Sequence, residues 1–475
     1  MPRTLQDSRL NFLFLKNGLE GLRQMNRSGN VFYQRTRHAI ERLMIALLVV
    51  GLPVGMVRAD TAHPRMTWIG TWYAAQQPPM PSAPSVYQDQ TLRLIVHASL
   101  GGPQVRIRLS NLYGDTPLTI GAAHIARRTS EADIEPTSDR ALTFNGQTSV
   151  MVPAHATVTS DPTRLSVPPL SDLAVSLYLP KPTTVTTVHI LGQQTSYASK
   201  PGNATAAAHF PVAKHTGMWP FLTGVDVIAK PPAFAVVAFG DSMIDGDGST
   251  PNANHRWPDA LAVRLQKAGK NVAVLNAGLI GNRLLHDSPR ASEFGAALGE
   301  AGLTRFQRDA LDQPGVKVVV VRIGGNDLGF NGGMAPSNET VNADDLIAGY
   351  RKLIAQARQH GLGIIGTTIP PFENADIPGY FTPAKDAMRQ HINAWIRQIG
   401  EFDAVLDFDQ IVRDPSHLTR LLPAYDSGDH LHPNDAGYAL VAAALPLATL
   451  DKLSSIGQAG ATSSSTTKTH GTPRQ

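Results

Sequence analysis

The chain contains no cysteine among its 475 residues. This absence excludes disulfide bonds, thiolate metal sites and a lipid-anchored cysteine. The sequence also lacks GxSxG and HExxH motifs, a P-loop and a Rossmann fingerprint, which disfavours nucleophile-elbow hydrolases, zinc proteases and the common nucleotide-binding enzymes. It has no internal repeat and no basic, aromatic-rich stripe, so we expect no nucleic acid partner.

Charge is also sparse, since only 17% of the residues are charged while 42% are hydrophobic. A chain of this length and composition can bury more than one core, and we expect two folded domains. The formal net charge is +4, but residues 1–59 hold nine basic and three acidic residues, leaving 33 basic against 35 acidic residues elsewhere. The basic excess therefore belongs to the N-terminal segment and indicates no acidic partner.

That segment has the pattern of an export signal. Arg35, Arg37 and Arg42 precede the apolar stretch 43–57, which ends at the small-residue pattern before residue 60. We therefore predict a leader over residues 1–59 and a secreted or periplasmic location. The apolar stretch has 15 residues, whereas a membrane span needs about 20. We therefore expect no stable span after cleavage, with an uncleaved anchor as the alternative. Because the part before Arg35 is long for a signal, Met25 is an alternative start of translation.

Residues 60–228 alternate in hydrophobicity with a period of two. Val105, Ile107 and Leu109 form one such series, and the odd positions of 173–179 form another, which indicates half-buried strands. With their Gly, Asn and Asp turns, these strands predict an antiparallel β-sandwich that is jelly-roll-like. Trp68 and Trp72 are predicted as core residues, with a sugar-stacking platform as the alternative.

Residues 229–452, after the linker at Lys230, alternate strands with helices. Apolar runs predict strands, and amphipathic stretches predict helices between them, so we expect a doubly wound parallel sheet. The predicted strands are 234–239, 271–275, 316–323, 363–369 and 404–408, and the predicted helices are 257–267, 343–359, 383–399 and 435–445 with Asn434 as the N-cap. Residues 453–475 are rich in Ser and Thr and are predicted to be a disordered tail.

Four short motifs carry polar side chains beyond these strands. They are Gly240-Asp241-Ser242, Asn276-Ala-Gly-Leu-Ile-Gly281-Asn282, Gly324-Gly325-Asn326-Asp327 and Asp429-His430-Leu431-His432. The first three follow predicted strands at loop positions, and the carboxyl ends of parallel strands share one edge of a sheet, where open α/β sheets bind ligands. The motifs therefore predict one active site.

The residue types in these motifs suit acyl-ester hydrolysis. A serine hydroxyl such as Ser242 becomes a nucleophile when an adjacent base takes its proton, and His432 with Asp429 three residues earlier can act as base and orienting carboxylate. The backbone NH of Gly281 and the amide of Asn326 can donate hydrogen bonds to an oxyanion.

Together the four motifs resemble those of the SGNH (GDSL) hydrolases over residues 232–450. The resemblance implies a flavodoxin-like sheet (the SGNH hydrolase fold), with Ser242, Asp429 and His432 as catalytic residues and Ser242, Gly281 and Asn326 as the oxyanion hole. It also implies a serine esterase that needs neither metal nor organic cofactor. With its β-rich N-terminal extension, the chain is similar to the arylesterase/acylhydrolase branch associated with xylan-degrading bacteria, which implies small-molecule or polysaccharide acyl esters, above all O-acetyl esters, as substrates.

Several of these residues have structural alternatives. Ser242 would suit a helix N-cap, and Gly278 and Gly281 would suit a tight turn. We interpret Asp327 as structural, through an Asx turn, and His430 as an ordinary polar loop residue.

Two other functions remain as alternatives. Asp241, Asp245, Asp247 and Asp287, with His255 and His286, suggest a metal-dependent phosphoesterase, but the calcium-loop pattern is incomplete and we expect a solvated acidic loop. A non-catalytic carbohydrate-binding protein would explain the β-rich half but not the four motifs.

Overall fold

The computed structural model describes residues 66–82 and 84–456. The leader predicted for residues 1–59 lies outside this range, and so does the predicted tail after residue 456. The last helix extends to Ser454, two residues into that predicted tail.

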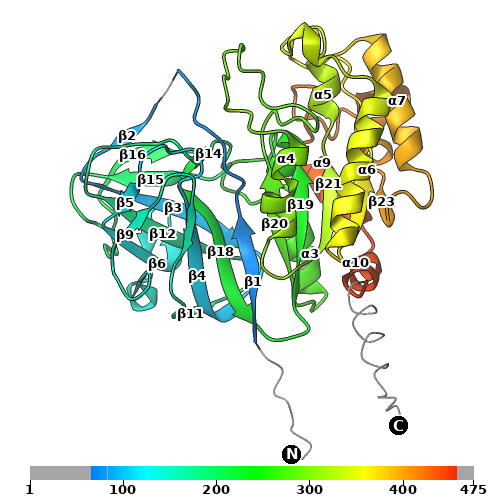
Figure 1. The fold of residues 1–475 in the computed structure, drawn as a ribbon. Helices are drawn as coiled ribbons and strands as arrows, with labels where there is room; N and C mark the ends of the chain where they lie inside the picture. Colours follow the sequence, from blue (N-terminus) through cyan, green and yellow to red (C-terminus); the bar gives the residue numbers. More distant parts are fainter. Residues whose placement is uncertain (1–65, 83, 457–475) are drawn as a thin grey trace, which may run out of the picture. The chain divides into compact units, whose positions relative to one another are not determined.

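The first described strands form antiparallel sheets, as predicted (Figure 1). One sheet has the order β1-β18-β4-β10, with β11 also paired to β4; it comprises β1 (Thr67–Tyr73), β18 (Leu222–Ala229), β4 (Gly102–Ser110), β10 (Thr157–Thr159) and β11 (Thr163–Val167). In β4 the buried apolar residues are Val105, Ile107 and Leu109, which confirms the predicted alternation.

The second sheet has the order β16-β15-β3-β12-β6-β7, with β8 also paired to β6. Its strands are β16 (Val212–Thr216), β15 (Ser196–Ser199), β3 (Gln90–Ala98), β12 (Ser171–Leu179), β6 (Ala122–Ser130), β7 (Asp133–Ile134) and β8 (Arg140–Ala141). Short two-stranded pairs complete the region: β2 (Val86–Tyr87) with β13 (Thr183–Thr184), β5 (Leu118–Ile120) with β9 (Val150–Val152), and β14 (Val188–His189) with β17 (Trp219–Pro220), and a 3₁₀ turn, η1, spans Pro136–Ser138.

Strand β12 is buried on both faces, which differs from the half-buried strand predicted there. Leu173, Val175 and Leu177 join the main core, whereas Ala174 lies in a second apolar cluster that includes Phe210. The predicted half-burial of β12 was wrong, because neighbouring segments of the chain also cover the small side chains on its second face.

The later strands form a parallel sheet with the order β20-β19-β21-β22-β23. Numbered along the chain, this order is 2-1-3-4-5. The strands are β19 (Phe234–Gly240), β20 (Val272–Gly278), β21 (Val316–Arg322), β22 (Gly363–Thr367) and β23 (Ala404–Leu406). The last two end two residues earlier than predicted. After β22 the chain leaves the sheet, and after β23 Asp407 caps the next helix by accepting from the NH of Gln410.

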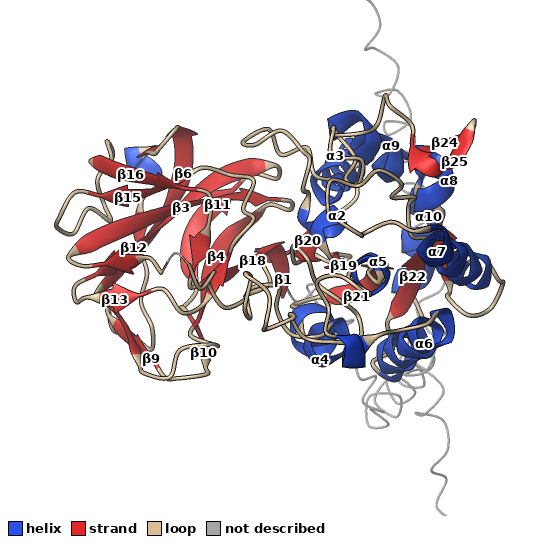
Figure 2. Cartoon of the chain, turned by 90° about the horizontal axis from the view of Figure 1, so that it is seen from above, coloured by secondary structure: helices blue, strands red, loops and turns tan. Residues whose placement is uncertain are grey.

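Helices cover both faces of this sheet, with α3 and α9 on one face and α4 and α6 on the other (Figure 2). The helices are α2 (Ser242–Asp245), α3 (Trp257–Lys267), α4 (Gly302–Phe306), α5 (Gly325–Gly329), α6 (Ala343–Gln359), α7 (Pro383–Ile396), α8 (Phe408–Val412), α9 (Asp435–Ala444) and α10 (Leu447–Ser454), with η2 (Gln307–Leu311), η3 (Ser337–Glu339) and the small pair β24 (Arg413–Asp414) and β25 (His417–Leu421) between them. Helix α7 ends three residues before its predicted end. The other long helices match their predictions within one residue.

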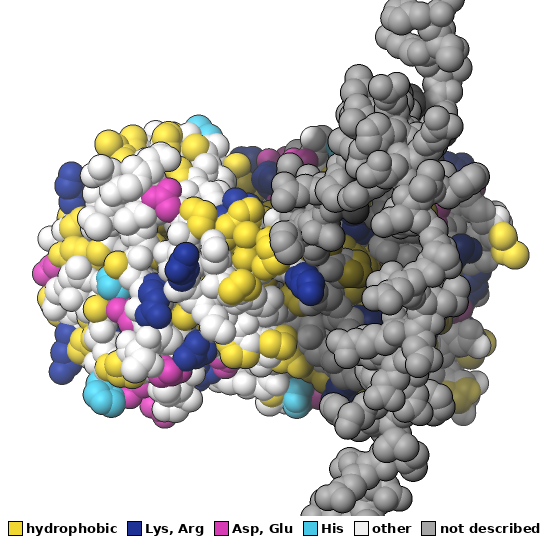
Figure 3. All heavy atoms as spheres, turned by 90° about the horizontal axis from the view of Figure 1, so that it is seen from below, with side chains coloured by type: hydrophobic (Ala, Val, Ile, Leu, Met, Phe, Trp, Pro, Cys, Tyr) yellow, Lys and Arg dark blue, Asp and Glu magenta, His cyan; other side chains and the backbone are white. Residues whose placement is uncertain are grey.

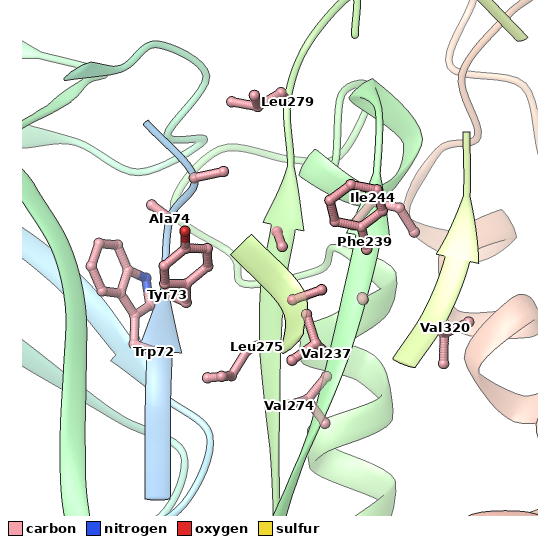
Figure 4. Packing of buried hydrophobic residues seen from close by; sticks show 14 of the residues in the cluster. Trp72, Tyr73, Ala74, Val237, Phe239, Ile244, Val274, Leu275, Leu279 and Val320 are labelled. Atoms are coloured by element: carbon pink, nitrogen blue, oxygen red, sulfur yellow. The ribbon is translucent and has the colours of Figure 1, made fainter. Parts of the chain in front are cut away.

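The β-rich region and the parallel sheet share one main core. Strand β1 packs beside β20, and the main cluster of buried side chains contains residues of both regions (Figure 4). The NH of Gly70 donates to the carbonyl of Pro314 at 2.9 Å, and the NH of Val274 donates to Ser99 Oγ at 3.0 Å. The segment around Lys230 thus joins two regions that fold against each other.

The two early tryptophans occupy different environments. Trp72 is buried and packs edge-on against Trp219, with ring centroids 4.9 Å apart, as predicted for a core residue. Trp68 is partly exposed, and the guanidinium of Arg106 lies 4.5 Å from its ring centroid. Arg106 therefore already occupies a face of the Trp68 ring that a sugar platform would need.

The surface of the β-rich region mixes side chains of different kinds. On the face that Figure 3 shows, basic, acidic and hydrophobic side chains are interspersed over this region. Among the described helices no single one has the length and apolar character to cross a membrane, and only the pair α9 and α10, bent by 55°, meets both criteria together.

Candidate active site

The first motif forms the turn from β19 into the short helix α2. Asp241 is the N-cap of this helix and accepts a hydrogen bond from the NH of Met243 at 3.2 Å. Ser242 is the first helical residue, so the N-cap interpretation of Ser242 is wrong. Because the cap is supplied by Asp241, the Ser242 hydroxyl remains available for other contacts.

The structure brings Ser242, His432 and Asp429 together. Ser242 Oγ lies 2.7 Å from His432 Nε2, and His432 Nδ1 lies 2.5 Å from Asp429 Oδ2. Asp429 Oδ1 also accepts the NH groups of Leu431 and His432 at 2.9 and 2.8 Å, which holds the carboxylate beside its own loop. These contacts align a hydroxyl, an imidazole and a carboxylate in the order that base activation requires.

The charges around His432 favour its protonated form. Burial alone would lower the pKa of His432, but the hydrogen bond to Asp429 and the charges of Asp247, Asp429 and Asp241 outweigh it and raise the pKa above the ordinary value. Burial alone would raise the pKa of Asp429, but the hydrogen bond to His432 and its charge lower it well below the usual range. The carboxylate is therefore ionised at neutral pH.

The predicted oxyanion donors occupy neighbouring turns. Gly281 has φ +67°, a left-handed conformation that favours glycine, in the loop after β20. Asn326 was predicted at a loop position but lies in the first turn of α5. Gly324, at φ +103°, is the N-cap residue of this helix. Asn326 Nδ2 donates to the carbonyl of Asn282 at 3.0 Å, which leaves the second hydrogen of this amide for another acceptor.

Tyr380 fixes the orientation of the Asn326 amide. Its hydroxyl donates to Asn326 Oδ1 at 2.8 Å, and both residues are buried. The Nδ2 group of Asn326 is thereby the end that can face a ligand. Among the hydrogen bonds of the described residues, the backbone NH groups of Ser242 and Gly281 donate to no protein acceptor.

The second motif also supports the helix that carries Ser242. Asn276 Nδ2 donates to the carbonyls of Ile244 and Asp245 at 2.8 and 3.2 Å. A Cβ on Gly278 would lie 2.2 Å from the backbone nitrogen of Asp245, so only glycine permits this close approach. The loop after β20 is thus packed directly against the end of α2.

The acidic cluster is not the solvated loop that we expected. Asp241 and Asp245 are buried, Asp241 forms an ion pair with Arg322, and Asp245 Oδ1 lies 2.9 Å from His189 Nε2. Asp247 Oδ2 lies 3.8 Å from His432 Nε2. Each carboxylate has its own cationic or titratable neighbour, and within the described residues no group of three acidic or His side chains has the geometry of a metal site.

The other polar residues noted in the sequence lie outside this arrangement. Asp327 is structural, but not through an Asx turn: its oxygens accept the NH groups of Leu284 and Leu285 at 2.6 and 2.9 Å. His430 is half exposed and lies 2.6 Å from Asp426. Of the remaining residues grouped with these aspartates, His255 pairs with Asp435 at 2.7 Å, Asp287 accepts the NH of Ala301 at 2.9 Å, and His286 is partly buried.

Sequence reasoning missed four contributors to the site. His189 comes from the β-rich region, Tyr380 lies outside the four motifs, Arg322 was treated only as a strand residue, and Asp247 was not connected with His432. The sequence signal for one of them was the charged side chain of Arg322 at the end of an otherwise apolar strand. In the structure it pairs with Asp241. His189 lies in the β-rich region and Asp245 after the first parallel strand, so no local sequence pattern connects the two.

A family model of the GDSL-like lipase/acylhydrolase family matches residues 238–440. The chain carries a GDSL-like lipase/acylhydrolase domain. This GDSL domain begins within β19 and ends within α9, so it contains all the predicted site residues. The protein is a carboxylic ester hydrolase of the SGNH/GDSL type. A search of curated proteins finds no match to the chain.

Solved structures similar to the chain include three described as esterases or lipases. A GDSL-like lipase from Bacteroides thetaiotaomicron is 20% identical and has a TM-score of 0.32, with 46% of this chain and 89% of that chain covered. An aryl esterase from M. smegmatis is 16% identical with a TM-score of 0.36 and coverages of 46% and 100%. A carbohydrate acetylesterase from Sinorhizobium meliloti is 16% identical with a TM-score of 0.35 and coverages of 47% and 99%.

Proposed function

We propose that the protein is a serine esterase that hydrolyses short acyl esters through an acyl-Ser242 intermediate. The observation that carries this proposal is the continuous contact from Ser242 Oγ to His432 Nε2, at 2.7 Å, and from His432 Nδ1 to Asp429. In this proposal Ser242 is the nucleophile, His432 is the general base and then the general acid, and Asp429 holds the imidazole in the required tautomer.

The reaction follows from this alignment. His432 Nε2 takes the proton of Ser242 Oγ as that oxygen bonds to the acyl carbon, and the carbonyl π electrons move to oxygen. The imidazolium then gives its proton to the alcohol oxygen as the bond to the acyl carbon breaks, leaving acyl-Ser242. Water repeats the sequence, with His432 taking its proton, and releases the acid and free Ser242.

The oxyanion formed in each half-reaction needs preorganised donors. The NH groups of Ser242 and Gly281 and the Asn326 amide are the groups that we assign to it. All three lie at the carboxyl edge of the parallel sheet, and Tyr380 fixes the Asn326 amide. Donors of this kind favour the transition state over the bound ester, because negative charge develops on the oxygen only during the reaction.

The substrate and the location are further parts of this proposal. We propose O-acetyl or similar short acyl groups on polysaccharide or small alcohols, with no metal or organic cofactor and no nucleic acid partner. The resemblance of the four motifs and the β-rich extension to the arylesterase/acylhydrolase branch supports the proposed substrate class. The leader pattern of residues 1–59 supports a secreted or periplasmic enzyme that keeps no membrane span after cleavage.

We also propose a division of the chain that follows its composition. Residues 1–59 are the leader, 60–228 a jelly-roll-like β-sandwich and 229–452 a flavodoxin-like SGNH hydrolase domain, whose last helix, α10, continues to Ser454. The strand order 2-1-3-4-5 and the two antiparallel sheets support the descriptions of the two folded parts.

The nucleophile is tested by Ser242→Ala. This variant should lose ester hydrolysis while its thermal unfolding stays near that of the unchanged protein, because the hydroxyl contributes chemistry and little packing. A fluorophosphonate should label Ser242 in the unchanged protein, as detected by mass spectrometry of the tryptic peptides, and EDTA should leave its activity intact. Undiminished turnover by Ser242→Ala would refute the nucleophile assignment.

The substrate class is tested separately on the same protein. Turnover of p-nitrophenyl esters of increasing acyl length should fall beyond short chains, and acetate release from acetylated xylan should exceed that from a lipid ester. A preference for long acyl chains would contradict the proposed substrate but leave the serine mechanism standing.

A further inference from the structure

His189 is a buried histidine of the β-rich region whose two ring nitrogens both face acceptors. Its Nδ1 lies 2.9 Å from the carbonyl of Ala75, and its Nε2 lies 2.9 Å from Asp245 Oδ1 and 3.1 Å from the carbonyl of Leu191. A neutral imidazole has one N–H and one acceptor nitrogen, so it would place a lone pair against one of these oxygens. An imidazolium donates at both ends and satisfies the geometry.

Asp245 connects this histidine to the active site. It is the last residue of α2, the helix that begins with Ser242, and its side chain is 2% exposed. Its Oδ1 faces His189, and its Oδ2 accepts the NH of Ile280 at 3.1 Å. Ile280 is the residue before Gly281. One carboxylate therefore contacts the β-rich region, belongs to the nucleophile helix and holds the loop of a proposed oxyanion donor.

The pair lies at a small cavity lined by both polar and apolar side chains. A cavity of about 20 Å³, enough for about one water molecule, lies at the pair and is lined by His97, Arg256 and Asp259 as well as by His189 and Asp245. The other titratable group that lines it is Tyr73, whose hydroxyl donates to Asp309. Arg256 is paired with Asp259 at 2.6 Å, and His97 with Asp172 at 2.7 Å, so Asp245 is the carboxylate left to face His189.

An aromatic ring also favours a cation at this position. The indole of Trp219 lies against the His189 ring, with centroids 5.4 Å apart and planes inclined by 30°. The face of an indole carries negative potential and attracts a positive charge. The Trp219 Nε1 group is occupied, since it donates to the carbonyl of Ile95 at 2.8 Å.

We propose that His189 is a positioning residue of the esterase: as an imidazolium it holds Asp245, and Asp245 holds Ile280 and thereby the Gly281 NH in place for the oxyanion. This inference rests on the proposed function and extends it to the β-rich region, which becomes part of the catalytic apparatus. Burial alone lowers the pKa of His189, but the charge of Asp245 and its hydrogen bond raise it overall, in agreement with the geometry.

Steady-state kinetics of the full chain on p-nitrophenyl acetate test the proposal. In His189→Ala and Asp245→Asn, kcat should fall about 10- to 100-fold because the oxyanion donor is misplaced, while KM stays nearly unchanged. The Ki of a boronic acid, which forms a tetrahedral adduct on the serine, should rise in parallel with the loss in kcat. In His189→Gln, which keeps one donor but no charge, the losses should be intermediate.

His97→Gln is the matched control, because His97 lines the same cavity but contacts Asp172 and Asn254 and makes no hydrogen bond to α2. It should keep kcat and the boronic acid Ki. Wild-type kcat in folded His189→Ala, with folding checked by circular dichroism, would overturn the proposal.

A measurement on the unchanged protein covers the case in which the variants do not fold. In ¹⁵N NMR at pH 7, where an ordinary histidine is mostly neutral, both ring nitrogens of His189 should carry protons. A neutral His189 ring at pH 7 would refute the proposed contact. These outcomes differ from failure of the proposed function, which would show as an active Ser242→Ala protein.

Discussion

Each of the two ring nitrogens of His432 has a carboxylate near it. Asp429 contacts Nδ1 at 2.5 Å, and Asp247 lies 3.8 Å from Nε2, the nitrogen that faces Ser242. Asp429 suits the orienting role because it also accepts two NH groups of its own loop. Asp247 makes no such contact with His432, so its effect on the imidazole is mainly electrostatic. Both charges favour the protonated imidazole and raise the pKa of His432.

This arrangement predicts a shifted pH dependence. Ester hydrolysis needs neutral His432, which exists above its pKa, so the acid limb of kcat/KM should lie above pH 6.5, the ordinary pKa of a histidine. Asp247→Asn removes one of the charges that raise this pKa, and the limb should therefore move to lower pH while the plateau rate changes little. The measurement is kcat/KM on a soluble ester between about pH 5 and 9.

Asp376→Asn is the matched control for the pH profile. Asp376 is an exposed carboxylate whose NH donates to the carbonyl of Asp429 at 3.0 Å, so it lies near the same loop without contributing to the pKa of His432. Its acid limb should coincide with that of the unchanged protein. A limb that stays in place in Asp247→Asn would contradict the electrostatic role of Asp247.

At the scale of elements, the start of helix α9 holds the loop that carries Asp429 and His432. Asn434 caps this helix by accepting the NH of Gly437 at 3.1 Å, as the sequence predicted. Its Nδ2 donates to the carbonyls of Ala424 and Asp426, each at 3.1 Å. One side chain therefore ends the loop and begins the helix, which couples the stability of α9 to the position of His432.

We predict that Asn434→Ala lowers both stability and activity. Loss of an N-cap costs about 1 kcal/mol of unfolding free energy, and kcat should also fall because the loop of His432 loses two contacts. Asn342→Ala is the matched control, since Asn342 caps α6 through a capping box with Asp345 and contacts no predicted site residue. It should lose similar stability in urea denaturation but keep kcat. Equal kcat in both variants would show that the cap does not position the loop.

At the scale of the whole described chain, a buried ionic network links the β-rich region to the parallel sheet. The hydroxyl of Tyr73, in β1, donates to Asp309 Oδ1 at 2.8 Å, and Arg305 lies 3.1 Å from Asp309 Oδ2. Arg305 also donates to the carbonyls of Gly240 and Ala277, at 2.6 and 2.9 Å. These carbonyls belong to the ends of β19 and β20, so the network supports the edge of the sheet where Ser242 lies.

This network and the shared core predict one cooperative unfolding transition. Tyr73→Phe removes a donor from a fully buried carboxylate and should cost about 1–3 kcal/mol of unfolding free energy. Urea transitions followed by circular dichroism and by tryptophan fluorescence should coincide before and after the substitution.

Tyr178→Phe is the matched control for this measurement. The Tyr178 hydroxyl also donates to a carboxylate, that of Asp89 at 2.6 Å, but at the surface, and its loss should cost less. Two separate transitions in the unchanged protein would show that the β-rich region and the parallel sheet unfold independently, against this prediction.

Much of the fold and the four motifs could be predicted from sequence because both depend on local patterns. A period of two identified β4 and β12, and apolar runs followed by glycine identified β19 and β20 with their loops. The loop after β20, the turn after β19 and the first turn of α5 meet because parallel strands end at one edge. Local patterns contain no information about what covers the second face of a strand, so the burial of β12 was missed.

The sequence alone determined the class of the sheets, the type of catalytic chemistry and the residues proposed to perform it. Only the tertiary structure decided which aspartates are buried, that both regions share one core, and that His189 contacts the nucleophile helix through Asp245. The physical reason is the range of the interactions. Periodicity and capping act over a few neighbouring residues, whereas the partner of a buried charge is set by the packing of β1 against β20, which brings together residues far apart in the chain.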